Sequence, residues 1–222
     1  VGFDYVWGDA LAEMERRRPD IRLINLETAV TGRTEPAPKG RNYKMAPANF
    51  PVITTAAVSC CALANNHVLD WGRQGLRDTL EAIARAGVKS AGAGRNLTAA
   101  AAPAILTIPS GRRALVLAIG SSTSGIPRTW AATQDEPGIH LLSGYSRPGI
   151  SRMGNLVRAA KRPGDLVIVS IHWGANWGYD VSEREIAFAH GLIDEAAVDV
   201  VNGHSSHNVK AIEIYRGKPI LY

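Results

Sequence analysis

The residues best suited to chemistry lie in one stretch, Ala64-Asn65-Asn66-His67-Val68-Leu69-Asp70-Trp71-Gly72. Two carboxamides, an imidazole and a carboxylate follow the apolar run at residues 58–64. Such a run, short and uncharged, predicts a buried strand, and we expect a helix to begin near Gly75. Open α/β sheets hold their ligands in loops of this kind, at the carboxyl ends of strands. Asn and Asp also form tight turns, so a loop without chemistry is the alternative.

Other polar side chains occupy the same kind of position, just after an apolar run: Asn25, Glu27, His172, His204 and His207. In a parallel sheet these strand ends would share one edge, so we expect the side chains to meet there. Imidazole, carboxylate and carboxamide groups together suit Zn, Mn or Fe better than Ca or Mg. The two remaining histidines, His140 and His190, have no such placement, and we expect them to be structural.

The elements that would position these residues alternate along the chain. Strands are expected at residues 21–26, 58–64, 88–91, 114–119, 165–171 and 198–201, with a hairpin at 212–222. Helices are expected at residues 10–18, 75–87, 96–102 and 156–160, and after the capping box Ser182-Glu183-Arg184-Glu185. Residues 31–49 and 121–149 are predicted to be long loops. This alternation predicts an α/β fold, and we expect residues 1–222 to form a single domain.

Composition limits the possible partners. The chain is 45% hydrophobic and 20% charged, as in an ordinary globular protein, and its net charge is +5. Its arginines are scattered rather than grouped with aromatic residues, which argues against a nucleic-acid interface. No apolar run approaches the roughly 18 residues of a membrane span. The two cysteines, Cys60 and Cys61, are adjacent in an expected strand, so we predict reduced core residues.

Four motifs together resemble the CapA family of capsule-synthesis proteins. They are Asn25-Leu26-Glu27, Asn65-Asn66-His67 with Asp70 and Gly72, His172-Trp173-Gly174, and Gly203-His204-Ser205-Ser206-His207. That family is associated with poly-γ-glutamate capsules and belongs to the calcineurin-like metallophosphatase superfamily. The resemblance implies a four-layer α/β/β/α sandwich with a metal centre at the sheet edge.

The resemblance also implies roles for individual residues. Glu27 would take the place of the bridging carboxylate, with Asn66 and His172 as further metal ligands. His204 and His207 stand three residues apart, where the superfamily has two, so we expect at least one of them to ligate. The implied cofactors are divalent transition ions (Mn, Zn or Fe), two of them in a complete domain. A first-strand Asp motif is expected upstream of Val1, and the chain ends within the strand-like run Pro219-Ile220-Leu221-Tyr222. We therefore expect the domain to be truncated at both ends.

The implied chemistry is metal-assisted hydrolysis of a phosphoester or of a bond in an acidic polymer, with His67 as general acid. A non-catalytic factor that assembles or anchors capsule polymer on the same fold is the alternative, so whether the chain is an enzyme stays open. Nothing in the sequence indicates the oligomeric state or the cellular compartment.

Further residues could contact an anionic substrate or capsule polymer. Asn25 and Asn65 lie beside the predicted ligands, and Arg41 and Lys44 are cations in the loop at residues 31–49. Solvated loop charges are the alternative for that pair of cations. Three tryptophans flank the motifs and would either form a rim around the site or pack beneath the loops: Trp71, Trp173 and Trp177.

Overall fold

The computed structural model describes residues 2–222 and confirms the α/β prediction. A three-stranded parallel sheet has the order β1-β4-β5, and a seven-stranded sheet has the order β10-β8-β11-β12-β14-β13, with β7 also paired to β8. The strands of these sheets are β1 (Leu23–Asn25), β4 (Cys60–Ala62), β5 (Lys89–Ala91), β7 (Ala104–Thr107), β8 (Arg113–Ser121), β10 (Leu141–Leu142), β11 (Leu166–His172), β12 (Val200–His204), β13 (Ile212–Tyr215) and β14 (Lys218–Leu221). Two small pairs complete the strands: β2 (Ala29–Val30) with β3 (Lys44–Met45), and β6 (Ala93–Gly94) with β9 (Gly138–Ile139).

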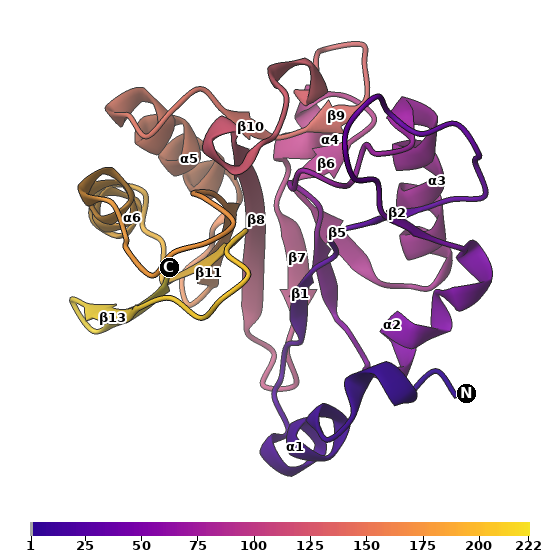
Figure 1. The fold of residues 1–222 in the computed structure, drawn as a ribbon. Coiled ribbons are helices and arrows are strands. Elements are labelled where there is room, and N and C mark those ends of the chain that lie inside the picture. The colour runs from indigo at the N-terminus through magenta and orange to yellow at the C-terminus, as the bar shows by residue number, and fades with distance from the viewer. Residues whose placement is uncertain (1) are drawn as a thin grey trace.

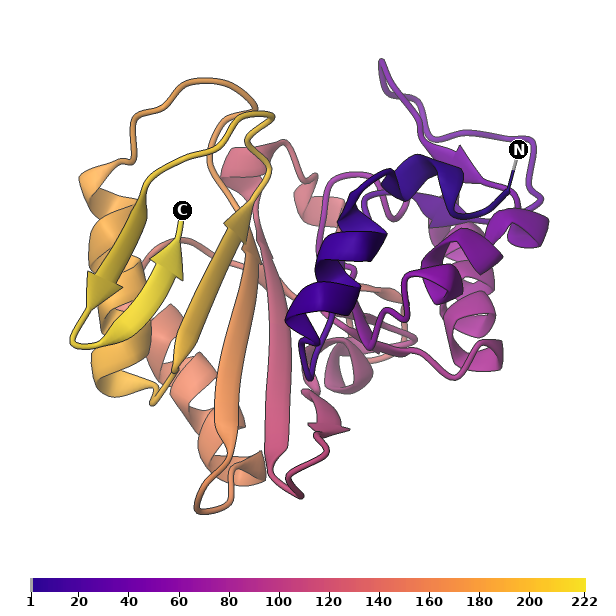
Figure 2. The ribbon, with the colours of Figure 1, turned by 90° about the horizontal axis from the view of Figure 1, so that it is seen from below.

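Helices lie on both outer sides of the strands (Figures 1 and 2). They are α1 (Ala10–Arg17), α2 (Pro51–Thr55), α3 (Gly72–Arg85), α4 (Leu97–Ala101), α5 (Arg147–Ala160) and α6 (Glu183–Glu195). Helices α5 and α6 contact each other and share one apolar core with the seven-stranded sheet. Helices α2 and α3 share the second core with the three-stranded sheet. The chain therefore buries two cores, one on each face of the longest strand, β8.

The alternation of side chains along β8 explains how one strand serves both cores. Leu117 and Ile119 point toward α5 and α6, whereas Val116 and Ala118 belong to the core of the three-stranded sheet. Successive side chains of a strand point to opposite faces, so a continuous apolar run is what a strand covered on both sides requires. The uniformly apolar sequence at residues 114–119 is buried throughout, as expected.

Most expected elements are present, some with different bounds. The capping box opens α6, because the Ser182 side chain accepts from the Glu185 amide and the Glu185 carboxylate accepts from the Ser182 amide. Helix α5 begins at Arg147, nine residues before the expected start, since Pro148 is tolerated in a first helical turn. Helix α2 and strand β7 lie where no regular element was expected. Residues 31–49 contain β3, and residues 121–149 contain β9 and β10.

Both cysteines are free and fully buried in β4, which confirms their predicted place in the core. Burial raises the pKa of each thiol to about 12, so both stay protonated at neutral pH. Among the described residues 2–222, no helix is long and apolar enough to cross a membrane.

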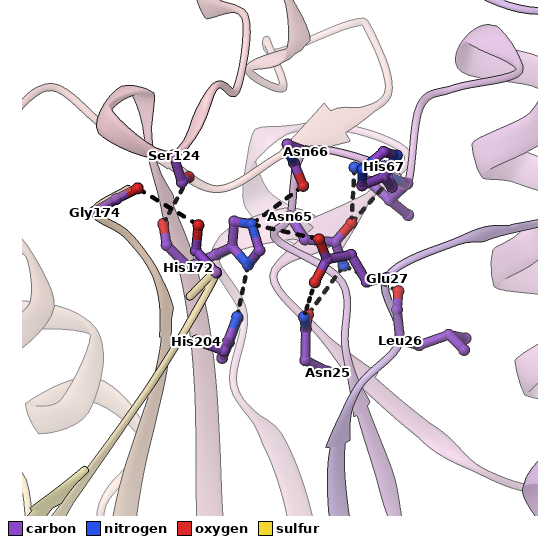
Figure 3. A network of polar contacts seen from close by, with 12 residues as sticks. Asn25, Leu26, Glu27, Asn65, Asn66, His67, Ser124, His172, Gly174 and His204 are labelled. Atoms are coloured by element: carbon purple, nitrogen blue, oxygen red, sulfur yellow. Dashed lines mark hydrogen bonds and ion pairs between the residues drawn. The ribbon is translucent and has the colours of Figure 1, made fainter. Parts of the chain in front are cut away.

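The sequence predicted that the polar strand ends share the edge of one parallel sheet, but they belong to two different sheets. β1 and β4 belong to the three-stranded sheet, while β11 and β12 belong to the seven-stranded sheet. The two sheets nevertheless bring their carboxyl ends together, and the predicted residues meet between them (Figure 3).

Candidate functional site

His67 is held by a buried carboxylate three residues further along the chain. Its Nδ1 lies 2.6 Å from Oδ2 of Asp70, which has no exposed surface. Asn65 shapes the turn between them, because its Oδ1 accepts hydrogen bonds from the amides of His67 and Val68. With Asp70 accepting from Nδ1–H, the ring is fixed in the tautomer that leaves Nε2 free to exchange a proton.

The loop at residues 31–49 folds back over this pair. Lys39 donates through Nζ to Oδ1 of Asp70 at 2.7 Å, and the Tyr43 amide donates to Oδ2 at 2.6 Å. The Tyr43 ring stacks on the His67 ring with centroids 4.0 Å apart. The loop is anchored again where the Ala37 amide donates to the Asp70 carbonyl. The Asp70 carboxylate therefore accepts hydrogen bonds from three donors. The imidazole of His67 is held by Asp70 at its Nδ1 and by the Tyr43 ring on one face.

A cavity of about 380 Å³ opens beside His67, and its lining is mainly polar and cationic. Its walls come from the loop at residues 31–49, the loop after β4 and three loops of the other sheet, those after β8, β11 and β12. The lining residues are Lys39, Arg41, Tyr43, Asn66, His67, Gly125, Asn176, Trp177 and His207. Two cations and two imidazoles face this space with no carboxylate among the lining residues. The cavity is therefore suited to an anionic group.

His172 lies at the centre of a second set of contacts, between the two sheets (Figure 3). Its side chain is fully buried, with Nε2 at 3.2 Å from Oδ1 of Asn66 and at 3.9 Å from Oε1 of Glu27. Its Nδ1 lies 2.7 Å from Nδ1 of His204, whose Nε2 lies 2.8 Å from Oγ of Ser170. His172 thus connects the histidine of β12 to the loop after β4.

Burial controls the protonation of these groups. It lowers the pKa of His172 to about 2, with further lowering by the neighbouring imidazoles His204, His67 and His207. Burial also lowers the pKa of His204 to about 3. Both rings are therefore neutral at pH 7 and carry a lone pair. Burial raises the pKa of Glu27, whose carboxylate accepts from the Asn25 amide at 2.7 Å.

The side chains of His172, Asn66 and Glu27 have the chemistry of ligands for a divalent transition ion. Neutral imidazole, an amide oxygen and a half-buried carboxylate converge within 4 Å of His172 Nε2, and a cation there would offset the cost of burying the Glu27 charge. Within residues 2–222, however, no three side chains of His, Cys, Asp or Glu form a group that could hold a metal. The metal centre therefore stays a proposal, as do the ligand roles predicted from the sequence.

His204 and His207 have different surroundings, although only two residues separate them. His204 contacts His172 and Ser170 through its two ring nitrogens. His207 is exposed, lines the cavity, and meets the Trp177 ring edge-on with centroids 4.9 Å apart. Ser205, between them, has a φ of 117°, a backbone conformation that residues other than glycine rarely adopt.

The structure separates the four predicted substrate contacts. Arg41 lines the cavity, whereas Lys44 lies 4.3 Å over the Trp71 ring and donates to the Arg33 carbonyl, away from it. Asn65 is fully buried, and its amide nitrogen donates to Asn25 and to the Leu26 carbonyl. Asn65 and Asn25 therefore do not line the cavity; they bind each other, and Asn25 donates to Glu27.

The three flanking tryptophans also differ. Trp173 is buried in the core and stacks on Tyr222, and Trp71 donates through its indole to the Tyr43 carbonyl beneath the loop. Only Trp177, with 70% of its surface exposed, lies at the rim of the cavity.

Sequence reasoning missed Lys39, Tyr43 and Asn176, and it gave Asp70 no role. Asp70 could have been found, because His and Asp three residues apart in a turn can contact each other. The other three come from loops that carry no local signal, and only long-range folding places them at the cavity.

Comparisons with known proteins agree with the four motifs. The chain matches the family described as "Bacterial capsule synthesis protein PGA_cap" over residues 1–222. A relative from Mycobacterium tuberculosis, named "Probable polyglutamine synthesis accessory protein", is 48% identical over 224 residues, covering 100% of this chain and 59% of the relative. The "PGA biosynthesis protein CapA" of Bacillus subtilis is 31% identical over 174 residues, covering 78% of this chain and 41% of the relative. This chain thus spans only part of the length of these relatives, and it belongs to the CapA family of bacterial capsule synthesis proteins.

Proposed function

We propose that this chain is a metal-dependent hydrolase domain acting in poly-glutamate capsule synthesis, and that it cleaves a phosphoester or a bond within the acidic polymer. The observation that carries the proposal is the His67–Asp70 pair in a cationic cavity beside His172, Asn66 and Glu27. The names of the relatives support the capsule context. We also propose that the helices and the two sheets correspond to the four-layer sandwich of metallophosphatases.

His67 would act as general acid. Asp70 holds its Nδ1–H, so Nε2 is the atom that would deliver a proton to the leaving oxygen of a substrate in the cavity. The Asp70 carboxylate would also stabilise the imidazolium before it donates. The Tyr43 ring keeps the imidazole in one plane, so that little orientational freedom is lost in the reaction.

Lys39 and Arg41 would bind the anionic part of the substrate. Arg41 is exposed at the cavity and free to turn toward a ligand, whereas Lys39 is held by Asp70 and the Asn66 carbonyl. Lys39 therefore provides a fixed positive charge, and Arg41 an adaptable one with a planar fork for carboxylate or phosphate.

Glu27, Asn66 and His172 would hold the metal, with His204 or His207 completing the set. When bound, a divalent ion would lower the pKa of a water molecule and neutralise negative charge on the reacting group. Asn25 and Asn65 would orient the Glu27 carboxylate through their connected amides.

The role of His67 can be tested with a generic phosphoester and added Mn or Zn. His67→Ala should retain bound metal and lose activity by a factor of about 10² to 10⁴, the usual range for a general acid. His190→Ala is a matched control, since His190 pairs with Glu213 at 2.9 Å and lies outside the cavity. Equal loss of metal and activity in His67→Ala would instead make His67 a ligand.

The metal site has a separate test that needs no turnover. His172→Ala should lose bound Mn or Zn in direct metal analysis, while His190→Ala keeps it. Unchanged stoichiometry in His172→Ala would refute the proposed ligand set. A metal-loaded wild type that hydrolyses neither phosphoesters nor poly-γ-glutamate would refute the catalytic proposal and favour a non-catalytic assembly factor.

A further inference from the structure

A second recessed surface lies at the opposite end of the seven-stranded sheet from His67. Two cavities, of about 390 and 470 Å³, share Arg112, Gly164 and Asp165, so they form one continuous depression. We call it the basal groove. It runs past the amino ends of β8, β11, β12 and β14, which for β8 is the lower end in Figure 1.

The basal groove is strongly cationic. Two carboxylates and five cationic side chains line it, and the cations are Arg112, Arg113, Lys161, Arg162 and Lys218. The lining thus has an excess of three positive charges, which is most of the net charge of +5 on the whole chain. A concentration of charge in a recess attracts polyanions more than the same charges scattered over a surface would.

Three of the cations already form ion pairs with carboxylates of the groove. Arg113 donates to both carboxylate oxygens of Asp165, through Nε at 3.1 Å and through Nη2. Lys161 and Lys218 both pair with Asp199, at 3.5 and 3.1 Å. These pairs fix the groove walls and neutralise both of its carboxylates.

Arg112 and Arg162 are the two cations that remain. Both are exposed, and neither has a carboxylate partner among the described residues. Arg112 donates only to the Gly164 carbonyl, at 3.3 Å. Two guanidinium groups of this kind, which line the same recess, can each bind a carboxylate of a ligand in bidentate geometry.

We infer that the basal groove binds the acidic polymer as an extended chain, at a site separate from the His67 cavity. The inference rests on the proposed role in poly-glutamate synthesis, because that role supplies a polyanion with one carboxylate for each unit. The groove passes the ends of four neighbouring strands, which lie about 4.8 Å apart, so it spans about 14 Å and can hold more than one unit. Its positive charge is complementary to such a chain.

The two sites lie at opposite ends of the same strands. β11 runs from Leu166, at the groove, to His172, at the candidate metal centre. Its seven residues rise roughly 3.3 Å each, so about 20 Å of strand separates the two ends. A polymer held in the groove would therefore keep its other segments near the protein without occupying the cavity.

Binding of labelled poly-γ-glutamate, measured by fluorescence anisotropy without added metal, tests the inference. The double variant Arg112→Gln/Arg162→Gln should bind about tenfold more weakly, because it loses two charge-assisted contacts to the carboxylates of the polymer. Its binding should also depend less steeply on salt. Arg162→Gln alone, which breaks no side-chain bond, should give a smaller loss. The control Arg77→Gln/Arg85→Gln removes the same charge from exposed positions of α3 and should leave binding unchanged.

Three results would overturn the inference: no polymer binding by the wild type, equal binding by the wild type and the double variant, or tighter binding of single-stranded DNA or anionic lipid vesicles than of the polymer. Because the assay needs no hydrolysis, it can succeed even where the proposed catalysis fails. Conversely, phosphoester hydrolysis by the double variant should match that of the wild type, since neither arginine lines the His67 cavity.

Discussion

The buried carboxylate of Asp70 should be the most sensitive polar group of the candidate site, and Asp70→Asn is the sharpest way to test this. Asp70 has no exposed surface and accepts from three donors: Lys39 Nζ, His67 Nδ1 and the Tyr43 amide. Asn has nearly the same shape but only one acceptor oxygen. In either orientation its NH₂ group would face a donor, so at least one donor loses its acceptor.

The size of the effect follows from these contacts. A hydrogen bond to a charged group contributes about 1.5 to 3 kcal/mol, and breaking a buried ion pair costs about 3 to 5 kcal/mol. The Lys39 side chain keeps 26% of its surface exposed, so water offsets part of the loss on that side. We therefore expect Asp70→Asn to reduce the free energy of unfolding by about 2 to 4 kcal/mol.

Urea unfolding at pH 7 measures this loss, and Asp194→Asn provides the control. Asp194 accepts from Tyr215 and pairs with Arg216 at 3.1 Å, but its side chain is 31% exposed. An exposed pair of this kind should contribute less than about 1 kcal/mol. A double-mutant cycle with Lys39→Met should then show a coupling free energy of about 1 kcal/mol or more between Lys39 and Asp70.

The reasoning would be refuted if Asp70→Asn unfolded at the same urea concentration as the wild type. A coupling free energy near zero would show that Lys39 and Asp70 do not stabilise each other. If stability fell while metal-dependent activity stayed unchanged, Asp70 would be a structural residue, and its proposed role in orienting His67 would be wrong.

Two further predictions concern stability away from the cavity. Burial, together with nearby Arg152, lowers the pKa of His140 from about 6.5 to about 4. Between these pH values the unfolded chain therefore binds more protons than the folded chain. The free energy of unfolding should fall by about 3 kcal/mol as the pH drops through that window. Urea unfolding of the wild type and His140→Gln from pH 7 to pH 4 checks this, and an equal pH dependence in both would contradict it. Gly92→Ala should lower the free energy of unfolding by about 3 kcal/mol, because φ is +89° and a Cβ would lie 2.6 Å from that of Ala118. At Gly87, where φ is +71° and the space around the Cα is open, the same change should lower it by about 1 kcal/mol. Thermal melts compare the two glycine variants, and equal losses would contradict the predicted clash.

The sequence by itself determined the local elements and the identity of the central groups. The capping box at Ser182 and the apolar runs of β8 and β11 act within a few residues, so their outcome is readable from neighbours in the chain. Placement after apolar runs also singled out His67 and His172, because the carboxyl ends of parallel strands are where loops collect polar side chains.

Only the tertiary structure decided which of those groups touch. His172 contacts Asn66 across 106 positions of sequence. His172 ends a strand of one sheet and Asn66 lies in the loop after a strand of the other, so no local pattern specifies their contact. Lys39 and Lys44 belong to the same polar loop, yet Lys39 reaches Asp70 and Lys44 turns away to Trp71. That choice depends on how the loop packs against residues far along the chain. Packing of this kind, unlike helix and strand periodicity, is fixed only when the two sheets have come together.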